Sequence, residues 1–452
     1  MHPFVKKLKT LRIGDAAIRR NPMFYRSVGE QLRACERADL QERRDWTRAR
    51  LGQALACAAR SRYGRRVGGG AELESWPLLE KSSVRDDPAA FSIGPALFAA
   101  RASTGGTTGI PLQLTRSLRS IVFEQACIDE MIRRLGVDPR QARVAVLRGD
   151  NIKDPSDLRP PYWASAAGGQ RLVFSTNHLS ATTVAHYAGA LREFRPDVLW
   201  AYPTALESLC VLLQRTRVEL SIPRVLTSSE MLHPGLWQLV VRTLGCELLD
   251  YYGQAERVAF AYAQRAQEYR FLPGYAHVEL HRVGAEGEHV DYEIVGTNLW
   301  NFAMPLPRYR TGDLLRLPAS WGAAELEELA LGLRTFAGVL GRDSDILVSP
   351  DGVRLTGIDH FQRDVSNIVR IQVIQEAADE VRILVLPDAG YGNDDAARLL
   401  DNVRAKLPGS MRVSIESAAA LERSTLGKIP FVIHRPAVRE LLNSTRDRGA
   451  AA

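Results

Sequence analysis

The most informative stretch of this chain is Ser103-Thr104-Gly105-Gly106-Thr107-Thr108-Gly109-Ile110-Pro111. It combines three glycines with four hydroxyl residues. Glycine lets the backbone turn tightly and approach a ligand closely. The N–H groups of such a turn can point at one anion, and Ser and Thr hydroxyls add donors. The stretch lacks the Gly-Lys-Ser/Thr ending of a Walker A loop. These residues alone are compatible with a phosphate-binding loop and with a polar hairpin turn.

Length and composition narrow the class of protein. A chain of 452 residues predicts two or more domains. The net charge of +7 is modest, and its one tight basic group, at residues 6–12, fits a solvated helix better than a nucleic-acid contact, so we expect no nucleic-acid partner. A weak membrane-surface role of this group stays open as an alternative. The five cysteines stand far apart without metal-ligand spacing and are expected to be reduced and mostly buried. No apolar run of membrane-spanning length and no secretory signal are found, which predicts a cytoplasmic protein without stable membrane insertion.

Five short apolar runs in the middle of the chain predict buried β-strands. They lie at residues 144–147, 172–174, 198–200, 225–227 and 247–251. Helical patterns precede and separate them, at residues 116–135, 182–194, 206–214 and 236–244. This alternation favours a mostly parallel α/β sheet flanked by helices. Because ligands of such sheets bind beyond the carboxyl ends of the strands, the loops after these strands are the expected place for chemistry.

The two ends of the chain have different patterns. Residues 1 to about 62 look helical, with Ile18 on the inward side and a break at Asn21-Pro22. Residues 275–317 favour antiparallel strands. From about residue 341, strands at 345–348, 353–355, 369–375, 380–386 and 411–415 and helices near 357–367 and 393–406 predict a compact α+β unit. We therefore expect a large N-terminal domain, residues 1–340, and a small mobile C-terminal domain, residues 341–452.

Two motifs follow predicted strands of the large domain. Tyr251-Tyr252-Gly253-Gln254-Ala255-Glu256 places an aromatic ring, which can stack on a base, near a glutamate that can hold a hard divalent cation beside phosphate. Tyr309-Arg310-Thr311-Gly312-Asp313 places a carboxylate at a turn, where it can accept hydrogen bonds from ribose hydroxyls or cap the turn itself. Each motif alone is also compatible with a structural turn.

Two further motifs lie at the domain boundary and near the end. Gly341-Arg342 opens the small domain, and its plain interpretation is a linker. Gly427-Lys428 is more informative, because the chain has only seven lysines. An exposed tail lysine is the plain alternative.

The order and spacing of these motifs resemble the adenylate-forming superfamily of acyl-CoA synthetases, nonribosomal-peptide adenylation domains and luciferases. The phenylacetate–CoA ligase and CapK-like branch is the most similar. The resemblance covers residues from about 16 to about 440 and also includes Pro77-Leu78-Leu79-Glu80-Lys81 and Phe174-Ser175-Thr176-Asn177-His178-Leu179-Ser180. It implies an enzyme that uses ATP, Mg²⁺ and coenzyme A.

The resemblance also implies a role for individual residues. Phosphate binding falls to Ser103, Thr104, Gly105, Gly106, Thr107, Thr108 and Gly109, with Thr107 as a catalytic residue. Adenine contact is implied for Ser229, Glu230, Tyr252 and Gly253, and Mg²⁺ binding for the catalytic Glu256. Asp313 would bind the ribose, and Arg342 would contact the ribose or a phosphate. The catalytic Lys428 would contact both the α-phosphate and the acid. His178 and Tyr202 match positions near the acid. Two positions depart from the family pattern: Ile110 replaces a frequent lysine, and Ser344 replaces a frequent acidic residue.

The implied reaction activates a carboxylic acid as an acyl-adenylate, releases pyrophosphate and transfers the acyl group to a thiol. An amine acceptor, adenylyl transfer to a hydroxyl, and a catalytically inactive nucleotide-binding protein are the alternatives. Aromatic residues at Phe174, Trp200 and Tyr202 favour an aryl or arylacetic acid, although such residues are also ordinary core. The family rotates its small domain between steps, here about Arg342-Asp343-Ser344. The oligomeric state is left open.

Overall fold

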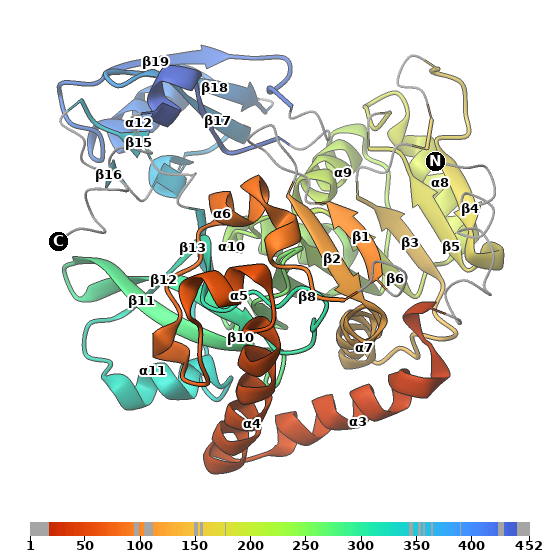
Figure 1. The fold of residues 1–452 in the computed structure, drawn as a ribbon. Helices are drawn as coiled ribbons and strands as arrows, with labels where there is room; N and C mark the ends of the chain where they lie inside the picture. The colour runs from red at the N-terminus through yellow and green to blue at the C-terminus, as the bar shows by residue number, and fades with distance from the viewer. Residues whose placement is uncertain are drawn as a thin grey trace. The chain divides into compact units, whose positions relative to one another are not determined.

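The computed structural model describes residues 18–94, 99–103, 112–148, 152–153, 157–176, 178–342, 347–350, 354–355, 358–362, 365–388, 390–423 and 429–440 (Figure 1). The chain divides into two compact units. The first comprises Met1–Thr311 and Leu315–Val339, and the second comprises Gly312–Leu314 and Leu340–Ala452. Among the described residues, none of the helices has both the length and the apolar character needed to cross a bilayer.

An eight-stranded sheet forms the centre of the first unit, with the strand order β10-β9-β8-β7-β6-β3-β5-β4. The parallel strands are β3 (Val144–Leu147), β5 (Arg171–Phe174), β6 (Val198–Ala201), β7 (Arg224–Ser228) and β8 (Glu247–Gly253). Antiparallel strands lie at its two edges: β4 (Trp163–Ala166), β9 (Phe260–Ala263) and β10 (Arg270–Phe271). The prediction of a mostly parallel α/β sheet is confirmed, whereas these antiparallel strands were not predicted.

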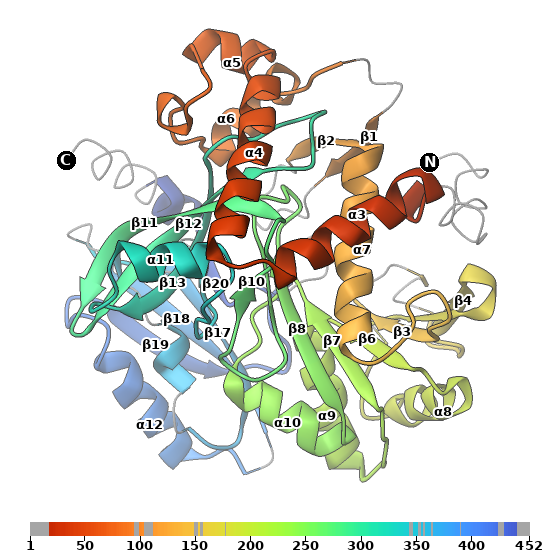
Figure 2. The ribbon, with the colours of Figure 1, turned by 90° about the horizontal axis from the view of Figure 1, so that it is seen from below.

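Helices cover both faces of this sheet (Figure 2). On one face, Leu147, Leu199 and Val225 pack in one apolar core with helices α8 (Val184–Phe194), α9 (Pro203–Thr216) and α10 (Pro234–Leu244). On the other face, Val198, Leu226 and Leu249 pack with α3 (Pro22–Arg37) and α7 (Leu118–Arg134). Successive strand residues point to opposite faces. A strand covered on both faces therefore reads as a continuous apolar run, which is the pattern seen in the sequence.

The N-terminal segment begins its described helices at the predicted break. Asn21 caps α3 by accepting a hydrogen bond from the Met23 N–H, and Pro22 opens the helix. Ile18 was expected to point inward but is 49% exposed, because it precedes the break and lies outside α3. The following elements are α4 (Leu40–Ala58), α5 (Arg62–Val67), α6 (Lys81–Asp86), β1 (Ala99–Ser103) and β2 (Gln113–Ser117). Strands β1 and β2 pair antiparallel on either side of the glycine-rich stretch.

A second, four-stranded sheet has the order β11-β12-β13-β14. Its strands are β11 (Ala276–Glu286), β12 (His289–Asn298), β13 (Tyr309–Pro318) and β14 (Val339–Arg342), with α11 (Ala323–Ala330) before the last strand. Strands β11 and β12 form an antiparallel hairpin, as the sequence predicted for this region. Short 3₁₀ helices elsewhere are η2 (Leu73–Ser75), η3 (Pro88–Ala90), η5 (Ala167–Gly169) and η7 (Ile358–Gln362).

The C-terminal unit contains a four-stranded sheet of order β19-β18-β17-β20. Its elements are β15 (Leu347–Val348), β16 (Arg354–Leu355), β17 (Ile368–Ala377), β18 (Glu380–Pro387), α12 (Asn393–Arg404), β19 (Arg412–Ser417) and β20 (Val432–His434). Strand β17 pairs antiparallel with β18 and parallel with β20. The helix expected near residues 357–367 is a 3₁₀ helix where it is described, since Ile368 already begins β17.

Four of the five cysteines are buried and none forms a disulfide. The expectation of reduced, mostly buried cysteines is therefore confirmed. Burial raises the pKa of the Cys35 and Cys210 thiols to about 12. These thiols are thus structural apolar groups rather than nucleophiles.

Candidate active site

Polar side chains gather where the parallel strands of the eight-stranded sheet end. Arg148 follows β3, Ser175 follows β5, Tyr202 follows β6 and Ser229 follows β7. Tyr252 lies in the last two residues of β8. Because the carboxyl ends of parallel strands meet at one edge, the fold brings these residues to a shared edge, called the carboxyl edge below.

Glu256 is a buried carboxylate beyond the end of β8. It is 6% exposed, and its Oε1 accepts a 2.8 Å hydrogen bond from the Tyr309 hydroxyl. The Lys81 ammonium lies 3.6 Å from the same oxygen. Backbone hydrogen bonds between Leu79 and the strand β13 hold these two partners together, from Leu79 N to Arg308 O (2.8 Å) and from Arg310 N to Leu79 O (3.0 Å). Three segments far apart in sequence therefore fix this carboxylate.

The oxygen ligands at Glu256 fit a Mg²⁺ ion that is shared with a nucleotide rather than one enclosed by the protein alone. Within the described part of the chain, the polar contacts of this carboxylate use Oε1, which leaves Oε2 for a cation. Among the described residues, no group of three or more metal-binding side chains forms a closed cage. Mg²⁺ commonly takes one or two protein carboxylates and completes its shell with water and substrate phosphates. The site thus suits an ion that arrives with a nucleotide.

The turn after β8 is held by its own side chains. Gln254 donates from Nε2 to the Tyr252 hydroxyl at 2.7 Å and accepts at Oε1 from the Ala259 N–H at 3.2 Å. A Cβ added to Gly253 would make only ordinary contact, 3.5 Å from Phe260. The packing of the protein itself therefore does not require glycine at this position.

Asp250 lies in β8, before this turn. It is fully buried and accepts hydrogen bonds from the Thr227 and Tyr269 hydroxyls. Burial raises the pKa of Asp250 to about 6, and the two hydroxyls offset only part of that effect. No cation of the described residues contributes to this shift, so within that part of the chain Asp250 is a hydrogen-bonded carboxylate without a counter-charge.

Ser229 and Glu230 follow β7. Ser229 has φ of 72°, a left-handed conformation that a non-glycine residue adopts only when its surroundings impose it. The Glu230 Oε2 accepts a 3.0 Å hydrogen bond from the Thr204 N–H in the first turn of α9. Glu230, predicted to line the adenine, therefore already has a helix-capping partner.

His178 and Tyr202 were predicted to lie near the acid. His178 is only 4% exposed; its Nδ1 hydrogen-bonds the Ser175 hydroxyl at 2.8 Å and its ring stacks on Tyr162. Its described contacts are those of a core histidine. Tyr202 is half-buried at the start of α9 and lies beneath the guanidinium of Arg148.

Arg148 is a residue that the sequence analysis missed. Its guanidinium carbon lies 4.2 Å from the centre of the Trp200 ring and 4.9 Å from that of Tyr202. It also donates to the Ser229 hydroxyl at 3.2 Å. Its position directly after a predicted strand was the one available signal, because that is where chemistry was expected.

Two family models match the chain. One is described as "AMP-binding enzyme" and matches residues 104–300, and the other is the CapK C-terminal domain, which matches residues 347–435. Protein CapK of Staphylococcus aureus is 20% identical over 336 residues, covering 70% of this chain and 72% of its own length. Phenylacetate–coenzyme A ligase of Aromatoleum evansii is 23% identical over 407 residues, covering 81% and 85%.

The chain belongs to the adenylate-forming superfamily. It stands on the branch of phenylacetate–CoA ligase and CapK and is an enzyme of the AMP-forming acid–thiol ligase class. A crystal structure of 2-hydroxyisobutyryl-CoA ligase in the postadenylation state with 2-HIB-AMP has the same fold, with a TM-score of 0.61 at 16% identity. The alignment covers 90% of this chain and 92% of that one.

Several predicted site residues of this ligase lie outside the described residues. They are Thr104, Gly105, Gly106, Thr107, Thr108, Gly109 and Lys428. Ser103 ends β1 and Arg342 ends β14, but their side chains are not described. Asp313 lies in β13, is 3% exposed and is counted with the second unit.

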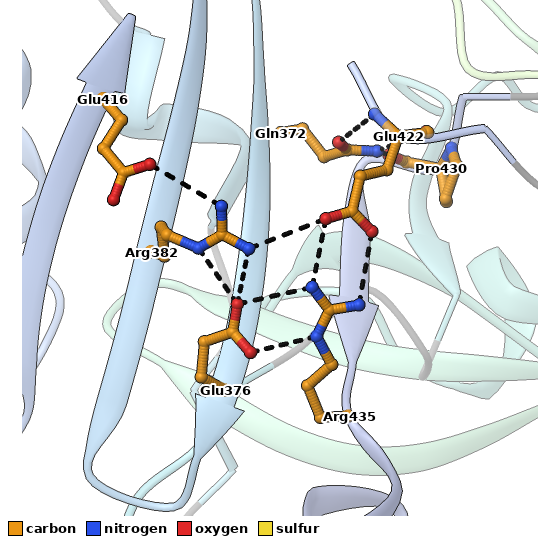
Figure 3. Close-up of polar contacts among 7 residues, drawn as sticks. All are labelled: Gln372, Glu376, Arg382, Glu416, Glu422, Pro430 and Arg435. Carbon is orange, nitrogen blue, oxygen red and sulfur yellow. Dashed lines mark hydrogen bonds and ion pairs between the residues drawn. The ribbon is translucent and has the colours of Figure 1, made fainter. Parts of the chain in front are cut away.

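The C-terminal unit of the ligase holds the two ends of the segment that contains Lys428. The side chain of Gln372, on β17, donates from Nε2 to the Glu422 and Pro430 carbonyls, each at 2.9 Å. Its Oε1 accepts from the Glu422 N–H at 2.8 Å. Gln372 is fully buried, so a single amide joins both ends of residues 423–429 (Figure 3).

Ion pairs surround this joint. Arg435 pairs with Glu376 at 2.9 Å and with Glu422 at 3.0 Å, and Arg382 pairs with Glu376 at 2.6 Å (Figure 3). Hydrogen bonds from Arg435 lead the effects that lower the pKa of Glu376. Glu422 is thus held both through its backbone and through its carboxylate.

Proposed function

We propose that this ligase activates an aryl or arylacetic acid with ATP and transfers the acyl group to coenzyme A. Glu256 carries the proposal: it is a buried carboxylate at the carboxyl edge, fixed by Tyr309 and Lys81, with one oxygen left for a cation. Such an arrangement holds negative charge next to a compensating ammonium, and it suits a nucleotide that brings Mg²⁺.

The first step brings two anions together. A carboxylate oxygen of the acid attacks the α-phosphorus of ATP, the bond to the bridging oxygen breaks, and pyrophosphate leaves. Mg²⁺ held by Glu256 would supply part of the charge neutralisation. The Lys428 ammonium would supply the rest at the α-phosphate, and an aimed cation of this kind contributes about 3 kcal/mol to the transition state.

The other predicted residues bind and orient the nucleotide. Residues 103–109, including Thr107, would hold the β- and γ-phosphates with backbone N–H groups and hydroxyls. Tyr252 would stack on the adenine. Asp313 would contact the ribose, Arg342 the ribose or a phosphate, and Ser229 the adenine.

In the second step the thiol sulfur attacks the acyl carbon, AMP departs and the thiol proton passes to solvent. The family's rotation about Arg342-Asp343-Ser344 would clear Lys428 from the acyl group before this attack. An aromatic acid is supported by the half-buried rings of Trp200 and Tyr202 at the carboxyl edge. Phe174, 1% exposed, belongs to the core and adds no support.

The test is ATP–pyrophosphate exchange with a panel of aromatic, arylacetic and aliphatic acids, followed by detection of AMP and acyl-CoA when coenzyme A is added. Exchange with aryl acids and thioester formation are expected. If exchange occurs without thioester formation and an amide forms when amines are supplied, the acyl acceptor is an amine and not coenzyme A. Absence of exchange with every acid would overturn the proposal.

A further inference from the structure

Arg148 belongs to a row of side chains on one face of the sheet. Strand residues two apart share a face, so Arg148 continues the face of Val146, and Trp200 that of Val198. Val146 and Val198 do lie on the side opposite the core shared with α8, α9 and α10. The register pairs Val146 with Trp200, which places Arg148 just beyond the Trp200 ring. The guanidinium therefore lies flat over the end of β6.

Among the described residues, this cation has no acidic partner. It contacts the two rings and the Ser229 hydroxyl there, and no carboxylate of that part of the chain lies within 4.0 Å. Its Nε is buried and makes no hydrogen bond. Four other arginines share that last feature, so it carries no weight alone. The combination does carry weight: a guanidinium that meets no carboxylate of the described residues is stacked on two rings, at the edge where sheets of this type generally bind ligands.

Ser229, whose hydroxyl accepts the hydrogen bond from Arg148, has an unfavourable backbone conformation. Ser229 has φ of 72°, a left-handed backbone conformation that is strained for a non-glycine residue. Strain of this kind persists where the surroundings impose it, and here it directs a hydroxyl toward the cation. The guanidinium is thus preorganised by three contacts before any ligand arrives.

The position along the edge sets this cation to one side of Glu256. The guanidinium stacks on Trp200, on β6, and donates to Ser229, just after β7, so it lies between the ends of these two strands. β7 is the neighbour of β8, whose loop carries Glu256, so at about 4.8 Å per strand the guanidinium lies roughly 5–10 Å from the end of β8. An acid whose reacting carboxylate meets the nucleotide near Glu256 would place its far end, not that carboxylate, over β6.

We propose that Arg148 binds a second anionic group, at the far end of the acid substrate. The substrate class is then an acid that carries a further carboxylate, sulfonate or phosphate across a ring or short chain from the reacting carboxylate. The guanidinium pairs with such a group in bidentate geometry. This inference rests on the proposed function and narrows its substrate.

The experiment uses matched pairs of acids in pyrophosphate exchange: phenylacetate with 4-carboxyphenylacetate, and hexanoate with adipate. The second member of each pair is expected to have the higher kcat/KM. Arg148→Gln should raise KM for the dianionic acid by about 10- to 100-fold, because a hydrogen-bonded charge is lost. KM for the neutral-tailed acid and KM for ATP should stay unchanged. Arg148→Lys should fall between the two, since lysine keeps the charge without the planar fork.

The matched control is Arg143→Gln. Arg143 precedes the same strand β3 at the opposite edge and stacks on Phe194 at 4.8 Å, so its loss should leave both acids unaffected. A rise in KM for ATP in Arg148→Gln would assign the cation to a nucleotide phosphate and overturn the inference. Equal use of both acids in each pair would overturn it too.

A binding measurement separates failure of the inference from failure of the proposed function. Isothermal titration of the full chain with 4-carboxyphenylacetate alone needs no turnover. Binding that Arg148→Gln abolishes and Arg143→Gln keeps supports the anion site even if exchange fails with every acid. Binding that both variants retain, or no binding to the unaltered chain, contradicts it.

Discussion

Arginines at the carboxyl edge and arginines in the C-terminal network are held in opposite ways. Arg148 rests on two rings and a hydroxyl with no carboxylate among the described residues near it. Arg382 and Arg435 each pair with at least two glutamates. A cation whose charge is already balanced can shape the protein but has little left for a ligand. An unbalanced one in the ligand-binding edge is available for an incoming anion.

The ion-pair network of the C-terminal unit is also partly exposed to solvent, which limits its contribution to stability. Side chains of Arg435 and Glu422 are 34% and 38% exposed, so water screens their attraction and each pair adds little stability. What the network does provide is geometry around Glu422 and Pro430, the ends of the segment with Lys428. The comparison therefore predicts binding defects at the carboxyl edge and positioning defects in the network.

The largest effect is expected from Lys428→Ala. Adenylation should fall by about 10²- to 10³-fold, because one aimed cation contributes about 3 kcal/mol at the developing charge. Pyrophosphate exchange measures this step, and a supplied acyl-adenylate with coenzyme A measures the second step, which should persist. Lys406→Ala is the control in the same unit. Normal exchange by Lys428→Ala would remove the reason for assigning a positioning role to the network.

Glu256→Gln tests the open carboxylate. It keeps the shape and removes the charge, so the Mg²⁺ concentration for half-maximal exchange should rise roughly tenfold or more while the fold remains. Glu293→Gln is the matched control, since Glu293 is equally buried but paired with Arg310. That variant should lower the melting temperature and leave the Mg²⁺ dependence unchanged. The same Mg²⁺ profile in both variants would make Glu256 structural.

Gln372→Leu tests the positioning role. It removes the bonds to Glu422 and Pro430, and a destabilisation of about 1–3 kcal/mol is expected for the unsatisfied backbone groups. Gln375→Leu is the control: Gln375 lies on the same strand, is fully buried and bonds the Val348 backbone instead.

The two glutamine variants should lose similar stability by denaturant titration. Only Gln372→Leu should reduce the rate of pyrophosphate exchange by about tenfold relative to the rate of thioester formation from supplied acyl-adenylate. A tenfold loss corresponds to about 1.4 kcal/mol in the free energy of activation. Parallel losses in both variants would show that Gln372 acts through stability alone.

Asp250→Asn tests the intermediate case, a carboxylate balanced by hydroxyls only. Since the pKa of folded Asp250 is raised to about 6 from an ordinary 3.8, its contribution to stability is fully present below pH 3.8 and is lost as the pH rises through 6. Between pH 5 and 7 the unaltered chain should lose about 1 kcal/mol relative to Asp250→Asn. Denaturant titrations of both proteins at these pH values measure it. An identical pH dependence would mean that a cation compensates Asp250 in solution.

The sequence by itself determined the elements and the order of the motifs. Apolar runs such as Val144–Leu147 predict strands because a strand covered on both faces needs no polar residue. Asn21-Pro22 marks the start of α3 for a local reason, a cap and a fixed φ. Motifs such as Tyr252-Gly253-x-x-Glu256 carry their spacing within the chain, so their resemblance to a family is visible without a fold.

Only the tertiary structure decided the partners. The Arg148–Ser229 contact spans 81 positions, and Gln372 reaches Pro430 across 58. Lys81 meets Glu256 only because β13 pairs with the segment at Leu79. No local pattern encodes which strand lies beside which, because strand order and register follow from packing the whole sheet. The sequence could thus place Glu230 and His178 near the edge, but only the fold showed that a helix end and a core hydroxyl already hold them.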